Sequence, residues 1–477
     1  MARGHNSESA SGTTRRMQTT AKGGARSPYF KDHCSHITTN SLNTGEEDDA
    51  QSSTRSVHYW RRMHADWIRA RSQGNQGFTE GELLSTAVIE AVEDAGIDVL
   101  DIDSFNLGQL GPNVNSNMAG GAGELCRWMG MSNKEGFSHD ECCSTASVGL
   151  HRAIEAVASG RSEIVLSANV NINLATSPQD GPALPQLRKP TDPNEFGRNA
   201  ALWVFELNYG FAGSVMLSPL DGWGGLYARK HGYSREQMWE AMNNILVLAR
   251  QNAYDNPLGL LADETYAEEA ERMGFDNAFE LLNDPMMNPR ICTLMRARDN
   301  SPAADGAAAV IVCSTEKAKQ IHSQPIEVAG FASSSNWVDD FGAYPVPVDV
   351  AVAQRAYDMA GITRPSEEID WLALHDCSTQ NWMTFSEDVG YYGPGEAWKA
   401  AMNGDMERQG RKPINTSGGR LGLGHPSAPA NGVEIAEAVN QMRGNCGDRQ
   451  MNNAPRTAVV QSVGGSWHFA NTVLRAL

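Results

Sequence analysis

The residue best placed for covalent chemistry in this chain is Cys143, within the run 136–160. Apolar residues recur at helical spacing in the second half of that run. Ser144 and Thr145 are good residues to begin a helix, so Cys143 falls at or just before a helix N-terminus. The positive end of a helix dipole favours a thiolate, which makes Cys143 a candidate nucleophile. The alternative is a small buried apolar residue, and we interpret neighbouring Cys142 in that way.

Three further stretches could supply acid–base groups or a binding loop. His375-Asp-Cys377 follows a predicted strand, at the end where open α/β sheets bind their ligands. Asn415–Gly419 and Gly424-His425-Pro426 lie in a Gly-rich loop before a predicted helix, and Gly464-Gly465 ends a strand. Each stretch also has a structural alternative: a hydrogen-bonded histidine, a turn, or a glycine pair that permits close packing.

Hydrophobic periodicity predicts the elements that must position these residues. Two segments, 94–103 and 358–370, share one pattern. In each, a helix end and a turn are followed by two acidic residues on either side of an isoleucine, and then by a strand. This repeat indicates two α/β halves of similar build with right-handed crossovers. The expected strands are 104–109, 164–168, 304–313 (buried), 326–331, 371–374, 458–463 and 471–477; the expected helices are 79–96, 146–157, 234–252, 266–282, 347–360, 383–390 and 433–442.

The chain has 477 residues, which is enough for two or three domains. Residues 1–55 lack hydrophobic periodicity and are expected to be a disordered extension. Residues 56–324 form the N-terminal half, with an inserted loop domain at about 170–295, and residues 325–477 form the C-terminal half.

Composition excludes several classes of protein. The net charge of −18 argues against a nucleic-acid surface, and no apolar run is long enough to span a membrane. The eight cysteines are scattered without a CxxC pair, so we expect no metal site and a reducing compartment. We predict a cytoplasmic protein. The alternative is the mitochondrial matrix of a eukaryote, because the first 45 residues are poor in acids and contain several arginines.

Taken together, the motifs resemble the thiolase superfamily, in particular the sterol-carrier-protein-type thiolases. Cys143-Ser-Thr-Ala-Ser147 is similar to the family's nucleophilic cysteine segment, and His375-Asp-Cys377 matches its HDC motif. Asn415-Thr-Ser-Gly-Gly419 with Gly424-His425-Pro426, and then Gly464-Gly465, are similar to the later motifs. The order and approximate spacing agree from about residue 79 to the C-terminus.

The resemblance implies a five-layered α/β/α/β/α fold, an acetyl-CoA acyltransferase (thiolase) activity and a set of roles. Cys143 would be the nucleophile, His425 would take its proton, His375 would bind the thioester oxygen, and Cys377 would be the acid/base at the substrate α-carbon. The backbone N–H of Gly464 or Gly465 would help to hold the oxyanion. Asn415, Ser417 and Gly418 are candidates for binding the co-substrate.

The reaction implied is cleavage (thiolysis) or formation of a 3-oxoacyl-CoA through an acyl-cysteine, with coenzyme A as co-substrate and no permanently bound cofactor. The substrate would come from fatty-acid or aromatic-acid degradation. The partners implied are acyl-CoA, CoA, a homodimer or homotetramer, and a small accessory subunit as in some relatives. Two alternatives stay open: a Claisen-type synthase or retro-aldolase on the same scaffold, and a non-catalytic acyl-CoA-binding protein.

Two segments depart from the family pattern. The first strand should fall near residues 56–66, where this chain is poor in aliphatic residues. After Pro426 the family usually has Leu-Gly-Ala-Thr-Gly, whereas this chain has Ser427-Ala-Pro-Ala-Asn-Gly432. We therefore expect an altered wall around the acyl group, and a substrate other than acetoacetyl-CoA.

Overall fold

A computed structural model of the chain describes residues 80–109, 121–171, 217–302, 304–335, 342–465 and 467–477. Contacts divide the chain into two units, 1–76 and 77–477, and every described residue belongs to the second. The predicted disordered extension and the predicted first strand near 56–66 lie outside the described residues. Among the described helices, none is both long enough and apolar enough to cross a membrane.

The first sheet has the strand order β2-β1-β3-β4. Strand β1 (Ser104–Gln109) pairs in parallel with β2 (Glu135–His139) and with β3 (Ile164–Asn171), and β3 pairs antiparallel with β4 (Gly306–Cys313). Helix α2 (Glu80–Ala95) contacts β3 and β4 and buries its apolar face there. Strand β4 is mostly half-buried, so the expectation of a buried strand there is wrong: in the described chain only β3 pairs with it.

The second sheet has the order β5-β8-β7-β6. Strand β6 (Trp371–Ala373) is parallel to β7 (Thr457–Val463), whereas β8 (His468–Ala476) is antiparallel to both β7 and β5 (Ile326–Ser335). Helix α11 (Pro347–Ala360) covers β5 and β8. It ends where predicted, because Gly361 takes the left-handed conformation that closes a helix.

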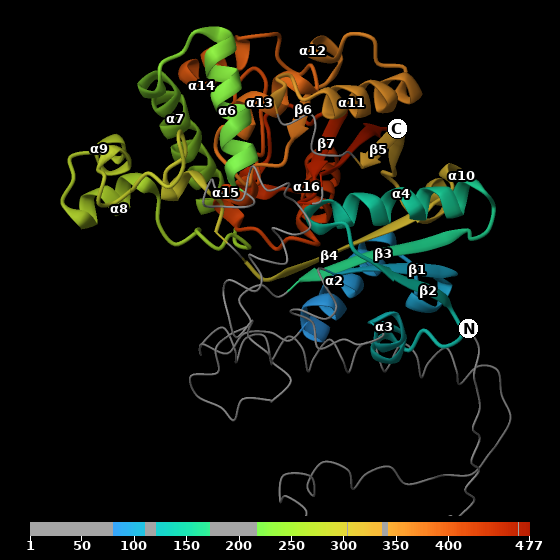
Figure 1. The fold of residues 1–477 in the computed structure, drawn as a ribbon. Helices are drawn as coiled ribbons and strands as arrows, with labels where there is room; N and C mark the ends of the chain where they lie inside the picture. Colours follow the sequence, from blue (N-terminus) through green and yellow to red (C-terminus); the bar gives the residue numbers. More distant parts are fainter. Residues whose placement is uncertain (1–79, 110–120, 172–216, 303, 336–341, 466) are drawn as a thin grey trace, which may run out of the picture. The chain divides into compact units, whose positions relative to one another are not determined.

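Between the two sheets lie helices α4 (Thr145–Ala158) and α16 (Ala430–Arg443), which contact each other and both sheets (Figure 1). Their shared core includes Leu150 on α4 and Ile435 on α16. The sequence of layers is therefore helix, sheet, helix pair, sheet, helix. The predicted five-layered fold is confirmed.

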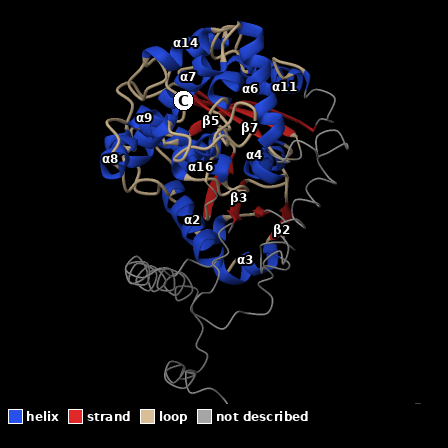
Figure 2. Ribbon diagram, turned by 60° about the vertical axis from the view of Figure 1, so that its left-hand side comes forward, coloured by secondary structure: helices blue, strands red, loops and turns tan. Residues whose placement is uncertain are grey.

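The predicted insertion is helical in its described part. Helices α7 (Arg235–Tyr254), α8 (Tyr266–Met273) and α9 (Ala278–Asn283) gather to one side of the second sheet (Figure 2). The single helix expected over 266–282 is wrong, because Gly274 adopts a left-handed φ of 82° and Asn277 begins a new helix. The remaining helices are α3 (Gly121–Met129), α6 (Leu217–His231), α10 (Thr315–Ile321), α12 (Pro365–Glu368), α13 (Asn381–Asp388), α14 (Glu396–Asn403) and α15 (Gly419–Leu423).

The predicted repeat has a structural counterpart in each sheet. The Asp103 carboxylate, before β1, accepts the N–H groups of Glu163 and Ile164 at 2.8 and 3.0 Å. The Asp370 carboxylate, before β6, accepts those of Arg456 and Thr457 at 2.8 and 2.9 Å. Each aspartate thus ties the entry of one parallel strand to the entry of its neighbour.

Candidate active site

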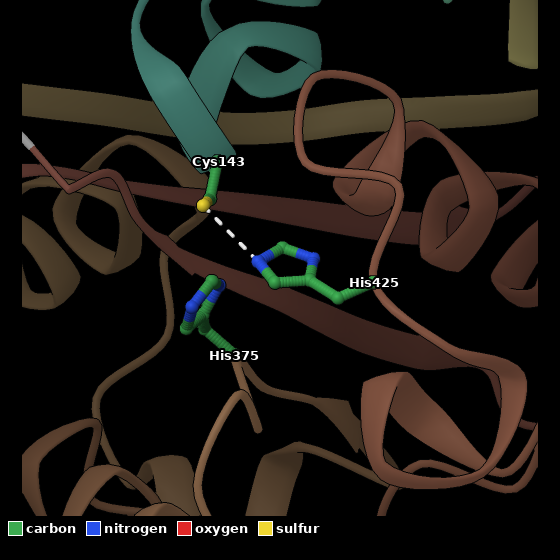
Figure 3. A group of neighbouring side chains, drawn as sticks. All are labelled: Cys143, His375 and His425. Carbon is green, nitrogen blue, oxygen red and sulfur yellow. Dashed lines mark hydrogen bonds between the residues drawn. The ribbon is translucent and has the colours of Figure 1, made fainter. Parts of the chain in front are cut away.

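Three of the predicted catalytic side chains converge on one point. The Nε2 atom of His425 lies 3.1 Å from the Cys143 sulfur. His375 joins them, so that one donor atom of each residue lies within 4.8 Å of the others. Figure 3 shows the thiol at the start of α4 facing the two imidazoles, which come from the loops after β6 and before α16. The three residues therefore share one site although they are separated by 50 to 282 positions in the sequence.

The Cys143 backbone is held in a tight turn. Cys142 has a left-handed φ of 50° and starts a 3-10 turn that leads into α4. The Thr145 hydroxyl donates to the Cys142 carbonyl at 2.6 Å and accepts the Glu141 N–H at 2.8 Å. The helix begins where the sequence indicates, and Thr145 fixes the turn just before it.

Ser144 joins the two halves and does not cap α4. Its hydroxyl donates to the His468 carbonyl at 2.7 Å and lies 2.8 Å from the Ser462 hydroxyl. The N–H of Ala146, in the first turn of α4, donates to the Ala428 carbonyl at 3.2 Å. The position of the Cys143 thiol therefore depends on the C-terminal half.

His375 and Cys377 are held by buried amide side chains. Asn415 clamps the preceding residue, since its Oδ1 accepts the Leu374 N–H and its Nδ2 donates to the Leu374 carbonyl. Gln461 accepts the His375 N–H at 3.0 Å. Asn381 donates to the His375 carbonyl at 3.0 Å and lies 3.8 Å from the Cys377 sulfur.

The predicted co-substrate residues lie inside the protein. Asn415 and Ser417 are fully buried, and the Ser417 hydroxyl lies 3.3 Å from both carboxyl oxygens of Glu434. A Cβ at Gly418 would lie 2.8 Å from that of Ala253. Asn415, Ser417 and Gly418 therefore position the His375 strand end and the loop before His425, while their assignment to the co-substrate stays a prediction.

The glycine pair separates into two roles. The Gly464 N–H donates to the His468 carbonyl at 2.8 Å, so it closes the β7–β8 hairpin and is not available to a substrate. A Cβ at Gly464 would lie 2.4 Å from the Glu141 carbonyl, which explains the need for glycine. The Gly465 N–H acts to lower the pKa of both Cys142 and Cys143. Of the two predicted oxyanion donors, Gly465 is the one that acts on the thiol.

Burial sets the resting charge of the site. Burial and, to a smaller extent, the nearby Cys377 thiol raise the pKa of Cys143 to about 12. Arg420, Ser427 and the Gly465 N–H act in the opposite direction. Burial lowers the pKa of His425 to about 3 and that of His375 well below its usual range, with the Arg420 charge acting in the same direction. At neutral pH the thiol is protonated and both imidazoles are neutral, so His425 can accept the thiol proton.

The same three donors could hold a metal ion. One sulfur and two imidazole nitrogens are ligands that Zn²⁺ accepts. The sequence predicts no metal here, and the same atoms also fit a cysteine nucleophile with its base.

Sequence reasoning missed three residues of the site. Ser427, within the segment that departs from the family pattern, acts to lower the pKa of Cys143. Arg420 is 2% exposed and acts on all four predicted catalytic residues. Gln461 holds both His375 and the buried Asp349. The departure after Pro426 could have pointed to Ser427, whereas nothing in the sequence marks Arg420 or Gln461.

Comparisons with known proteins show what the chain resembles. Residues 346–475 match the family model "Thiolase C-terminal domain-like". The chain is 25% identical to an acetyl-CoA acetyltransferase of Methanothermobacter thermautotrophicus, over 81% of this chain and 91% of the relative. It is 26% identical to a steroid side-chain-cleaving aldolase of Thermomonospora curvata, over 78% and 87%. It is 29% identical to sterol carrier protein 2 of Oryctolagus cuniculus, over 36% and 33%.

Solved structures share the fold. The Ltp2-ChsH2(DUF35) aldolase superposes with a TM-score of 0.64 at 23% identity, over 84% of this chain and 94% of the other. A monomeric SCP2-thiolase-like protein type 1 from Mycobacterium smegmatis gives 0.57 at 16% identity, over 84% and 75%. The C-terminal match and the relatives support the resemblance to the thiolase superfamily, in particular to the sterol-carrier-protein-type thiolases, and the solved structures share its fold.

Proposed function

We propose that this protein is an acyltransferase of the thiolase type, which cleaves or forms a 3-oxoacyl-CoA through an acyl group carried on Cys143. The observation that supports it best is the 3.1 Å approach of His425 Nε2 to the Cys143 sulfur. His425 takes the thiol proton as the sulfur attacks the carbonyl carbon of the substrate. The Gly465 N–H lies beside the sulfur and is the described donor best placed to stabilise the resulting oxyanion.

Cleavage then releases an acyl-CoA carbanion that must be protonated at its α-carbon. Cys377 is the proposed acid, and in the direction of synthesis it is the base. His375 donates to the thioester oxygen of that carbanion, which carries negative charge in its enolate form. CoA finally attacks the acyl-cysteine and returns the thiol to Cys143.

Mass spectrometry of the intact protein after exposure to a panel of 3-oxoacyl-CoAs tests the proposal. We expect a mass increase equal to one acyl group on Cys143 and loss of that adduct, with loss of thiolysis, in Cys143→Ala. Cys142→Ala is the matched control, since this neighbouring thiol should be dispensable. A Cys143→Ala variant that keeps full thiolysis would refute the proposal.

A second candidate is a retro-aldolase or Claisen-type synthase, because relatives at similar identity include a steroid side-chain-cleaving aldolase. A retro-aldol cleavage needs no acyl-cysteine and consumes no CoA. Measuring whether free CoA disappears in step with cleavage separates the two reactions. A co-purified small subunit that restores weak activity would support the proposed accessory partner; light scattering would test the proposed homodimer or homotetramer.

A further inference from the structure

Arg420 places a buried positive charge beside the candidate site. It lies in α15, and its side chain is 2% exposed. Its Nη1 donates to the Leu374 carbonyl at 3.1 Å, one residue before His375. Its Nη2 donates to the Asn431 side-chain oxygen at 2.9 Å, in the first turn of α16. The guanidinium thus links the strand end that carries His375 to the helix that follows His425.

The positive charge of Arg420 is only partly compensated. Its Nη1 lies 3.6 Å from Asp376, and the Asp376 oxygens accept the Arg420 backbone N–H at 2.8 Å and the Trp382 indole at 3.0 Å. Arg296, another buried arginine, instead forms a bidentate pair with Asp299 at 2.8 and 3.0 Å. Because neutral oxygens receive both hydrogen bonds from the Arg420 side chain, its field extends to the groups around it.

A second nearby acid does not supply the missing negative charge at neutral pH. Glu434 is buried, and burial raises its pKa to about 8 in spite of the opposing effect of Arg420. The carboxyl group is therefore mostly protonated at pH 7. The ionisable groups around Cys143 are Cys142 on its own turn, His375, Asp376 and Cys377 after β6, and Arg420 and His425 before α16. Arg420 is the permanently charged cation of this group.

We propose that Arg420 is a positioning residue of the site: it fixes the strand end that carries His375 and supplies a permanent positive charge that favours anionic sulfur and anionic oxygen there. A fixed charge in a site of low dielectric needs no rearrangement as negative charge develops. The part of this inference that concerns the substrate enolate rests on the proposed function. The part that concerns the Cys143 thiol does not, and it can be tested without a substrate.

The test compares Arg420→Met, Arg420→Lys and Arg443→Met. Arg443 is a matched control, because it is also largely buried, with bonds to Gln324 and Asp94 at the other end of α16. The readout is the rate of Cys143 alkylation by iodoacetamide at fixed pH values of about 7 to 9, below the pKa of the thiol, with tandem mass spectrometry to separate Cys143 from Cys142. Thermal unfolding of each variant identifies losses due to misfolding.

We expect Arg420→Met to slow Cys143 alkylation at each pH below the pKa of the thiol, and each unit by which that pKa rises lowers the rate about tenfold. Arg420→Lys keeps the charge and should restore the rate, while losing thiolysis because the two hydrogen bonds are broken. Arg443→Met should lower thermal stability without changing the rate. A folded Arg420→Met variant with an unchanged rate would overturn the inference, whether or not the protein proves to be a thiolase.

Discussion

The two α/β halves have the same build and very different chemistry. Asp103 and Asp370 tie the same pair of strand entries in each half, and α4 and α16 occupy corresponding places between the sheets. Yet the first half contributes one predicted reacting side chain, Cys143. The second contributes His375, Cys377 and His425. It also contributes the buried Arg420, Asp376 and Glu434. The two halves therefore share a scaffold, whereas the predicted reacting groups are divided unequally between them.

This division makes the site depend on how the halves meet. The thiol of Cys143 and its proposed base, His425, belong to different halves, and their 3.1 Å contact joins the turn before α4 to the loop before α16. Ser144 and Ala146 bond directly to residues of the other half. We therefore expect the neutral thiol to be activated only when the contacts between the halves keep it beside the neutral imidazole of His425.

The largest effect in this comparison separates the roles of two predicted reacting groups of the second half, Cys377 and His425. Cys377→Ser should slow thiolysis at least about 100-fold, because general acid–base catalysis typically contributes that much or more. The same variant should still exchange an acyl group between acyl-CoA and labelled CoA, since that step needs only Cys143 and His425. Assays of thiolysis and of CoA exchange check both outcomes.

Cys446→Ala is the control for this experiment, as Cys446 is a buried cysteine of the same half that bonds to Glu437 away from the site. It should leave both rates unchanged. If Cys377→Ser lost acyl exchange and thiolysis to the same degree, the proposed division of roles would be wrong.

An intermediate effect concerns Glu434, a buried acid of the second half. The native pKa of Glu434 is raised to about 8 by burial, so between about pH 4.5 and 8 the unfolded chain ionises this group while the native protein does not. Its contribution to stability is therefore present at low pH and is lost as the pH rises. In the wild type this ionisation should lower the free energy of unfolding by about a few kcal/mol between pH 5 and 8. Glu434→Gln cannot ionise at this position and should not show that decrease.

Urea unfolding of the wild type and of Glu434→Gln at pH 5 and pH 8 measures this difference. Glu155→Gln, on the exposed face of α4 in the other half, is the control for loss of one carboxylate. A gap between wild type and Glu434→Gln that stays constant with pH would contradict the prediction.

Sequence periodicity predicted most elements because their apolar faces are regular. Strand β1 and helix α11 occur with the bounds expected. Strand β2 was missed: its five residues, Glu135–His139, are mostly exposed and carry no alternating pattern. Helix α15 was missed because Gly418 and Gly419 at its start indicate a loop, although both adopt left-handed φ values that allow close packing.

Motifs predicted which residues of the site meet, but not what surrounds them. The three residues in Figure 3 were identified by their motifs, taken in order, and by the resemblance of those motifs to the thiolase superfamily. The contacts that Asn415 and Ser417 make within the protein were not predicted, because a conspicuous polar motif can bind the protein's own groups as readily as a ligand. Arg420 was missed, because a single arginine on a short helix looks solvated until the fold buries it.

The smallest effect tests the comparison of the halves directly. Asp103→Asn and Asp370→Asn each replace a carboxylate that accepts two backbone N–H groups at an exposed strand entry. Each should lower the free energy of unfolding by about 1 kcal/mol, since hydrogen bonds to a charged acceptor are weakened but not all lost. Urea unfolding of both variants and of the double variant measures the two effects and their sum. Equal and additive losses would support duplicated, independent ties, whereas a loss at only one aspartate would mean that the resemblance between the strand entries is geometric and not energetic.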